Sequence, residues 1–361
     1  MATKTHRKAK SGTKKTRHDK KQARKTAKGR QKHKKHVQGE MQLPETRPVS
    51  FEDAVILNIL NNSEQPTVSN EAFLFTSTLS SLTPEMQRLY YKAGMSIGRA
   101  LYRSASNGKV YTVPEEPVPD LVRFFEKAGN EKITYDAFPD KVAVNIYGRK
   151  SPNLGARIHS FEAGIIAGFL SAANRMLINV AETSCSASGS EFCRFTTNPA
   201  KRMDTGVSPS LDGLAEYIPE HLSEAHKEID GARVAMAYYS LLIPSLLAPE
   251  YSEQIKRIAE HIGYSMSAKL FNSLNAKPNS KKAMDSIAST IRLLNLGDPS
   301  IKSLRPFDML ISFDALASKR GFVDISMAFV NGMLANSVKS DLTATERNRN
   351  GSYVIEIKER S

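Results

Sequence analysis

Hydrophobic and polar residues along the chain follow two recurring patterns. In EMQRLYYKAGMSIGRALYR (85–103) the apolar residues fall three and four positions apart, which predicts a helix with one apolar face. From Phe161 onward, apolar residues recur every four positions, which predicts a second such helix. KVAVNIY (141–147) instead alternates between core-type and other side chains, as a strand does.

The segment after the second helix predicts a strand hairpin. LINVAET (177–183) and FCRFTTN (192–198) are strand-like, and the turn between them contains Gly189. Gly164 and Gly168 give the preceding helix a smooth face that another element can approach closely. Helices, a strand, a further helix and a hairpin in this order predict an α/β fold of mixed (α+β) order, with helices packed on a small antiparallel sheet.

The same patterns occur twice. GMSIGRALY, which begins at Gly94, matches GYSMSAKLF at Gly263, and FEAGIIAGFL around Gly164 matches FVNGMLANSV around Gly332. The two glycines are 70 residues apart in the first copy and 69 in the second. FLFTSTLSSLTPE likewise pairs with YYSLLIPSLLAPE, and DKVAVNIYGRKS with DMLISFDALASK. This constant spacing predicts a duplication.

We therefore expect one domain in 48–200 and a second in 212–361, joined by the turn-rich segment 199–213. Related domains often associate, so the two copies are expected to form an internal pseudo-dimer. GMSIG also fits the G-x-S-x-G pattern of a nucleophile elbow, but a helix precedes it where that elbow needs a strand. Close packing of two helices explains its small residues better.

The charge of the chain is concentrated at its N-terminus. Residues 1–36 contain 16 Lys or Arg and one acid, Asp19, whereas the rest of the chain has a net charge of −1. The stretch 4–35 has no Leu, Ile, Val or aromatic residue, so it cannot offset its ordering entropy by burial. This composition predicts a basic disordered tail over residues 1–40.

A flexible cationic tail binds phosphate backbones, DNA or RNA, without reading base sequence. Anionic lipid headgroups are an alternative partner, but no amphipathic face or lipidation motif supports it. A role in solubility is a third possibility. We prefer nucleic acid. The predicted contact residues are Lys4, Arg7, Lys8, Lys10, Lys14, Lys15, Arg17, Lys20, Lys21, Arg24, Lys25, Lys28, Arg30, Lys32, Lys34 and Lys35.

No apolar run approaches the length that spans a bilayer, and the basic N-terminus lacks the apolar segment of a signal peptide. The expected location is the cytoplasm, with association to the nucleoid or the ribosome. In a reducing compartment the two cysteines, Cys185 and Cys193, are expected to bind metal or to be free thiols. Their spacing alone leaves these two interpretations equally open.

The stretch 157–199 resembles the C-terminal half of the 4-vinyl-reductase (hydrocarbon-binding) domain family. The matching elements are Gly164, Gly168, Glu182, Cys185, Gly189, Cys193 and Phe195. Aromatic-sensing members of that family hold zinc through Cys, Glu, Cys and Cys, the first cysteine lying 23 residues before the glutamate and five before the first glycine. Both spacings lead to His159 here, and histidine is a competent zinc ligand. The resemblance thus implies a structural zinc site of His159, Glu182, Cys185 and Cys193.

The second copy matches only the scaffold. Met327 stands at the position of His159, and TERNRNGSYVIEI contains no cysteine, so this copy is expected to be metal-free. No nucleotide-binding motif occurs in the chain. The resemblance implies non-enzymatic binding of a small hydrophobic or aromatic ligand, because sensor members of that family bind such molecules without transforming them; the alternative is an enzyme or carrier in lipid or tetrapyrrole metabolism with an incidental tail. Phe73, Phe75, Tyr90 and Tyr91 are candidates for a ligand pocket or for an ordinary core.

Overall fold

The computed structural model divides into residues 1–48 and one compact unit formed by residues 49–361. The predicted basic tail and all sixteen predicted nucleic-acid contacts lie outside the described residues. The structure describes residues 50–361 except for 63, 107–110, 112, 114, 130–131, 139–140, 149, 199–206, 225–232, 247, 314–319, 339–340, 350–351 and 361.

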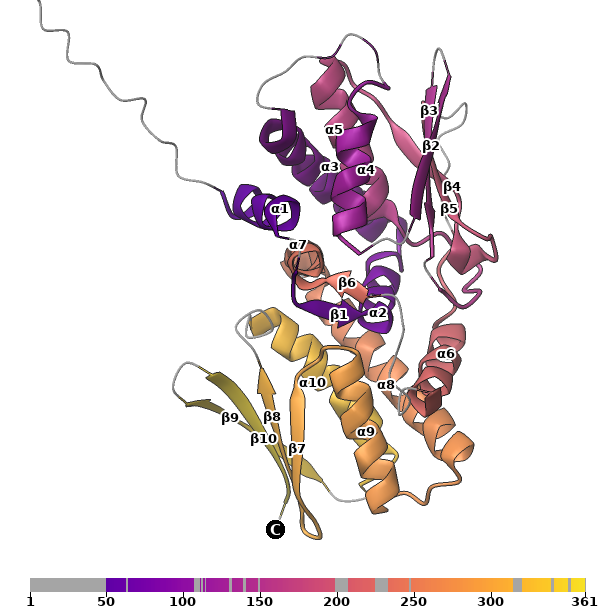
Figure 1. Cartoon of the computed structure of the whole chain (residues 1–361). Coiled ribbons are helices and arrows are strands. Elements are labelled where there is room, and N and C mark those ends of the chain that lie inside the picture. Colours follow the sequence, from indigo (N-terminus) through magenta and orange to yellow (C-terminus); the bar gives the residue numbers. More distant parts are fainter. Residues whose placement is uncertain are drawn as a thin grey trace, which may run out of the picture. The chain divides into compact units, whose positions relative to one another are not determined.

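The described residues form ten α-helices and three small antiparallel sheets, a mixed α/β arrangement (Figure 1). The first half consists of α1 (Phe51–Asn61), β1 (Thr67–Ser69), α2 (Asn70–Ser80), α3 (Pro84–Ser106), α4 (Val118–Lys127), β2 (Lys132–Phe138), β3 (Lys141–Tyr147), α5 (Ser160–Asn174), β4 (Val180–Ser184), the 3-10 turn η1 (Ser186–Ser188) and β5 (Cys193–Thr197). The second half consists of α6 (Leu211–Glu224), β6 (Arg233–Ala235), α7 (Met236–Leu246), the 3-10 turn η2 (Pro249–Tyr251), α8 (Ser252–Leu274), α9 (Lys281–Leu293), β7 (Asp298–Leu304), β8 (Phe307–Phe313), α10 (Arg320–Ala335), β9 (Leu342–Arg349) and β10 (Ser352–Glu359).

The two halves repeat one order of helices and strands and one sheet topology. The strand order is β2-β3-β5-β4 in the first half and β7-β8-β10-β9 in the second, with every neighbouring pair antiparallel. The predicted helices are confirmed as α3 and α5, and the predicted strands as β3, β4 and β5. The sequence pattern indicated a single strand before α5, whereas the structure has the hairpin β2–β3 there.

Two helix crossings explain why glycine recurs at matching positions. A Cβ atom on Gly94 would overlap Phe161 O, and one on Gly164 would overlap Tyr91 O, so α3 and α5 touch backbone to backbone. In the second half, Gly263 and Gly332 make the reciprocal contact between α8 and α10. GMSIG thus lies within a helix at a tight crossing, as its small residues predicted, and not at a strand-to-helix elbow.

The second glycine pair of the first crossing is replaced in the second half. Gly98 and Gly168 again bring α3 and α5 into backbone contact. The corresponding residues of α8 and α10 are Ser267 and Asn336, and Asn336 Nδ2 donates to Ser267 Oγ at 3.0 Å. A partly buried hydrogen bond therefore joins the helices where the first half uses close backbone contact.

The sequence pairing of the strands before α5 and α10 was wrong by one residue. Matching DKVAVNIYGRKS to DMLISFDALASK sets Val144 opposite Ser312. In the structure Val144 belongs to the core, and so do Met309 and Ile311, the neighbours of the half-buried Leu310. Successive side chains of a strand point to opposite faces, so a shift by one residue exchanges the core face for the outer face.

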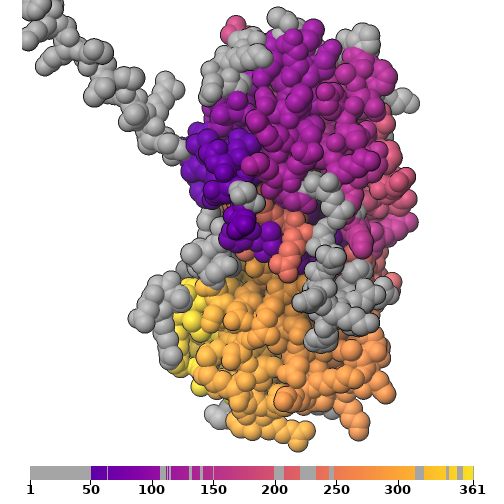
Figure 2. Space-filling view, viewed as in Figure 1, coloured from indigo at the N-terminus to yellow at the C-terminus, as the bar shows by residue number. Residues whose placement is uncertain are grey.

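The halves are joined by equivalent elements. β1 pairs with β6 in antiparallel register, Thr67 lying opposite Ala235. Figure 2 shows the first half, coloured from indigo to pink, lying against the second, coloured from coral to yellow. Phe75 of α2 packs edge-on against Phe329 of α10, with ring centroids 5.4 Å apart. Conversely, Tyr238 of α7 packs against aromatic rings of the first half. Each half therefore completes its core with a helix of the other.

The aromatic residues proposed for a pocket lie in this core. Phe73, Phe75 and Tyr90 are buried, and half-buried Tyr91 accepts a hydrogen bond from Val180 N–H at 3.1 Å through its hydroxyl oxygen. Among the helices that the structure describes, none is both long and apolar enough to cross a bilayer.

Candidate metal centre

The hairpin β4–β5 positions the two cysteines. Cys185 directly follows β4 and Cys193 opens β5. Between them η1 ends at Gly189, whose φ of +86° lies in the left-handed region that favours glycine. Ser188 N–H and Ser190 N–H both donate to Cys185 O, at 3.0 and 3.1 Å, which fixes the cysteine backbone at the start of the turn.

The N-terminus of α5 supplies the histidine. His159 immediately precedes the helix, and its carbonyl accepts the first helical hydrogen bond, from Ala163 N–H at 3.1 Å. Its own N–H donates to Glu182 Oε2 at 3.1 Å. One carboxylate oxygen of Glu182 is thus bound by the backbone, and the other, Oε1, is directed to the His159 ring.

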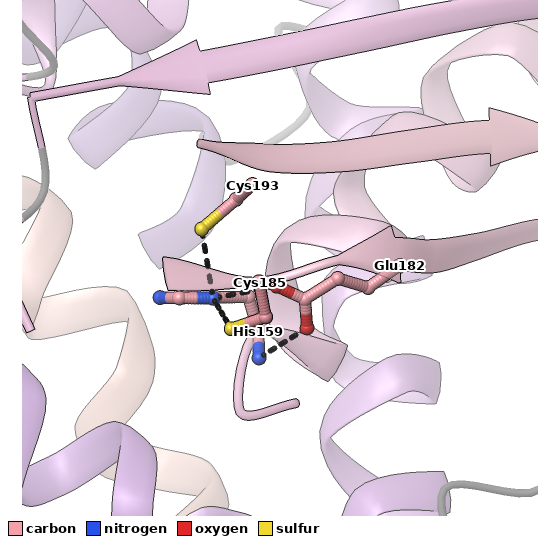
Figure 3. Close-up of side chains that lie close together, drawn as sticks. All are labelled: His159, Glu182, Cys185 and Cys193. Carbon is pink, nitrogen blue, oxygen red and sulfur yellow. Dashed lines mark hydrogen bonds and ion pairs between the residues drawn. The ribbon is translucent and has the colours of Figure 1, made fainter. Parts of the chain in front are cut away.

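All four predicted ligands meet at one point (Figure 3). His159 Nδ1 lies 2.8 Å from Glu182 Oε1, 3.4 Å from Cys185 Sγ and 3.5 Å from Cys193 Sγ. The four ligand atoms all lie within 4.8 Å of one another. Within the part of the chain that the structure describes, this is the one group of three or more such side chains close enough to hold a metal ion.

The cluster is almost completely shielded from solvent. The exposed fractions are 2% for His159, 5% for Glu182, 0% for Cys185 and 1% for Cys193, and both cysteines are free thiols. Burial of so many ionisable groups is costly unless they are paired or coordinate a metal. Their concentration at one buried point forms a group that could bind a metal ion.

The metal-free cluster retains protons. Burial alone would lower the pKa of His159, but Cys193 and Glu182 raise it to about 10 through their charge and hydrogen bonds. The hydrogen bond to Cys193, together with burial, raises the pKa of the Cys185 thiol far above its usual range. Burial also raises the pKa of Glu182, against the opposing effect of His159. A metal ion that binds here must displace these protons.

Two edges of the cluster can be compared with those of a tetrahedral zinc site. Zinc bond lengths of about 2.3 Å to sulfur and about 2.0–2.1 Å to nitrogen imply a sulfur–nitrogen edge of about 3.6 Å. The observed edges are 3.4 and 3.5 Å. The nitrogen–oxygen edge expected in the same way is about 3.4 Å. The observed value is 2.8 Å, because the carboxylate bonds directly to the imidazole, so a metal requires this pair to separate slightly.

Ser186 is a functional candidate that the sequence pattern did not reveal. Its N–H donates to Cys193 Sγ at 3.4 Å, and its hydroxyl lies 3.4 Å from the same sulfur. Hydrogen bonds of this kind orient a metal ligand and tune its charge. The only sequence signal is the position directly after Cys185, which by itself predicts no such contact.

The centre is in contact with the second half through Phe73. The Phe73 ring stacks on His159 at 6.4 Å and on Tyr238 of α7 at 6.1 Å. The Tyr238 hydroxyl donates to Glu162 Oε1 at 3.2 Å, and Glu162 is buried on α5 three residues after His159. Perturbing the metal centre therefore perturbs the junction between the halves.

The second half places a different group at the equivalent point. Met327, at the position of His159, is 9% exposed and lies within α10, because that helix begins at Arg320. A separate cavity of about 350 Å³ occurs in this half. Met284 and Phe307 form its buried apolar part, and Arg305 and Glu359 are among its polar lining residues.

Comparisons with known proteins find similarity over only a small part of the chain. A stretch of 44 residues is 46% identical to part of the uncharacterized protein MJ0150 from Methanocaldococcus jannaschii, covering 12% of this chain and 25% of that protein. The chain thus spans about a quarter of the length of this relative. No protein-family model and no solved structure matches the chain.

Proposed function

We propose that the first half binds one structural zinc ion through His159, Glu182, Cys185 and Cys193. The observation that carries this proposal is the buried convergence of two thiols, an imidazole and a carboxylate within 4.8 Å. Thiolate and imidazole ligands together favour zinc over magnesium or calcium. Four protein ligands leave no open coordination position, which is the pattern of structural sites and not of catalytic ones.

The zinc ion would join the end of the β4–β5 hairpin to the start of α5. These ligands come from separate segments and do not converge in an unfolded chain, so metal binding contributes directly to folding. Native mass spectrometry with elemental analysis of protein purified without chelator is expected to find one zinc per chain. Cys185→Ser combined with Cys193→Ser should abolish it, whereas His261→Ala, at an exposed histidine of α8, should not. Zinc-free wild-type protein would refute the proposal.

The ligand of the domain, on this proposal, is a small hydrophobic or aromatic molecule that is bound and released unchanged. Support comes from the resemblance of 157–199 to the hydrocarbon-binding domain family and from the absence of nucleotide-cofactor motifs in the sequence. Native mass spectrometry of the full chain should detect a retained apolar molecule. Turnover of vinyl-substituted substrates with reduced nicotinamide would instead favour the alternative, an enzyme of lipid or tetrapyrrole metabolism.

Two places for such a ligand can be distinguished by substitution. The first is the aromatic core of the first half, where Tyr90 and Phe161 pack with ring centroids 6.4 Å apart. The second is the cavity lined by Val338 and Phe307. Val338→Phe fills that cavity, so it should block a ligand bound there and leave a ligand of the first half unaffected. Zinc content provides the control for folding of the first half in this variant.

The basic N-terminus is proposed to attach the protein to nucleic acid in the cytoplasm, at the nucleoid or the ribosome. Neutralising phosphates releases counterions, so log affinity should fall linearly with log salt, with a slope of about −0.9 per duplex phosphate contacted. If half of the basic residues engage at once, the slope is roughly −7. Residues 37–361, with a net charge of −1, should bind weakly or not at all. Equal affinity of full-length and tail-deleted protein would refute this proposal.

A further inference from the structure

The two cysteines face each other across neighbouring strands. Ser184 of β4 pairs with Arg194 of β5, so the next residues in register are Cys185 and Cys193. Directly opposite residues of an antiparallel pair have Cα atoms about 4.5–5.5 Å apart. A disulfide requires a Cα separation of about 4.4–6.8 Å. Extending the register by one residue beyond β4 thus sets the two cysteines opposite each other, and their sulfurs lie within 4.8 Å, which favours a bond between them.

We propose that Cys185 and Cys193 are also a reversible redox modification site, at which peroxide converts the dithiol into an intramolecular disulfide. One thiolate attacks the peroxide, which breaks the O–O bond, forms a sulfenic acid and releases hydroxide. The second thiolate then attacks that sulfur, forms the S–S bond and releases the second hydroxide. The two protons that the thiols give up convert the hydroxides to water, so the dithiol loses two electrons and two protons and the peroxide gains them.

Formation of the disulfide removes two of the four proposed zinc ligands, so metal occupancy becomes dependent on the thiol redox state. This part rests on the proposed zinc function, whereas the disulfide itself does not. His159 and Glu182 keep their two mutual hydrogen bonds, from the ring Nδ1 to Oε1 at 2.8 Å and from the backbone N–H to Oε2 at 3.1 Å. The disulfide also ties together the strand ends that zinc would tie. Zinc and the disulfide are thus alternative cross-links of one hairpin.

The burial of both cysteines limits which oxidants can reach them. With 0% and 1% of their surface exposed, Cys185 and Cys193 are inaccessible to bulky reagents in the folded chain. Hydrogen peroxide is close to water in size and is the class of oxidant that can reach them. A large aromatic disulfide reagent should therefore modify the folded protein far more slowly than peroxide oxidises it.

The test uses the full chain and reads zinc and covalent state separately. Zinc-loaded protein is treated with hydrogen peroxide while a chromogenic chelator reports free zinc and mass spectrometry reports the peptide 176–194, which lies between Arg175 and Arg194 and contains both cysteines. We expect release of one zinc per chain and a loss of about 2 Da from that peptide, both reversed by a dithiol reductant. Cleavage after Glu191 should give two fragments that stay joined until reduction.

The outcomes separate this inference from the proposed zinc function. Oxygen addition to the cysteines without a joined fragment pair, or no change in mass at all, overturns the disulfide even if zinc is bound. A disulfide formed by protein that binds no zinc even while its cysteines are reduced supports the redox site and refutes the metal function. The measurements are made on wild-type protein, so they do not depend on whether a cysteine variant folds.

Discussion

Replacing a glycine by alanine where α3 crosses α5, or where α8 crosses α10, should destabilise the whole compact unit. An alanine Cβ at position 94 would lie 2.9 Å from Ile165 N and 3.0 Å from Gly164 Cα, and would overlap Phe161 O. Favourable contacts between carbon atoms begin at about 3.5 Å. The neighbours are backbone atoms of a helix, so no side-chain rotation relieves the overlap, and α3 and α5 must separate by about 0.5–1 Å.

The expected cost follows from this separation. A gap of about 0.5–1 Å forfeits a quarter to a half of each dispersion contact along the crossing, and overpacking a core costs about 1–3 kcal/mol. The absence of flexible neighbours puts Gly94→Ala at the upper end of that range. Alanine within a helix loses less conformational entropy on folding than glycine, and this stabilises the folded state by about 0.5–1 kcal/mol. The net loss is about 2 kcal/mol, which lowers the Tm by about 3 °C for a unit that spans residues 49–361.

Scanning calorimetry of the zinc-loaded protein checks this expectation in both halves. Gly263→Ala should lower the Tm about as much as Gly94→Ala, because its Cβ would overlap Phe329 O in the same way. Gly213→Ala is the matched control. It lies inside α6, and its Cβ would meet mainly the end of the flexible Leu154 side chain, at 3.3 Å. A Gly94→Ala protein as stable as the Gly213→Ala protein would refute the packing argument.

Two further predictions concern the junction and the metal centre. Tyr238→Phe removes the hydroxyl that donates to the buried Glu162, and should lower the free energy of unfolding in urea by about 1.5–3 kcal/mol. Tyr264→Phe is the control, because that tyrosine is 51% exposed, and it should leave the free energy of unfolding unchanged. Equal effects of the two substitutions would contradict the assigned hydrogen bond. Because the pKa values of His159, about 10, and Cys185 are raised in the metal-free site, zinc binding at pH 8 should release about two protons. Calorimetric titration in two buffers of different ionisation enthalpy measures this number, and a value near zero would contradict the ligand assignment.

Local periodicity in the sequence was sufficient for the strongly patterned elements. α3, α5 and β3 have core faces that repeat at their own period, so each could be predicted without its neighbours. β2 was missed because it is an edge strand whose residues after Ile133 are mostly exposed, so it carries no alternating pattern. The one-residue error between the copies arose at β3, whose residues 142–146 are all buried, so that its composition does not mark one core face, whereas the core residues of β8 alternate with less buried ones.

The four proposed metal ligands could be predicted from the sequence because their spacing resembles a known pattern. The residues packed around them could not be predicted. Phe73, His159 and Tyr238 come from three separate segments, and only the folded chain shows that the Phe73 ring lies against both of the others. No spacing rule relates α7 of the second half to the N-terminus of α5. The contact follows from the exchange of helices between the halves, which is a property of their association.

The structure also offers a reason why the proposed metal would be needed in the first half and not in the second. The β9–β10 hairpin of the second half pairs eight residues from each strand in continuous register, while β4–β5 pairs four, with an irregularity between Glu182 and Ser184. α10 begins twelve residues before Gly332, but α5 begins only four residues before Gly164. The second half therefore continues its helix across the position where the first half places His159. α5 and α10 are almost equally long, 15 and 16 residues, so the difference between the halves lies in where the helix starts and in the length of the hairpin. A short, irregular hairpin is held by few backbone hydrogen bonds. The four proposed ligands lie near the end of that hairpin and at the start of α5, so the proposed metal ion would supply in the first half a connection that the longer β9–β10 hairpin provides in the second.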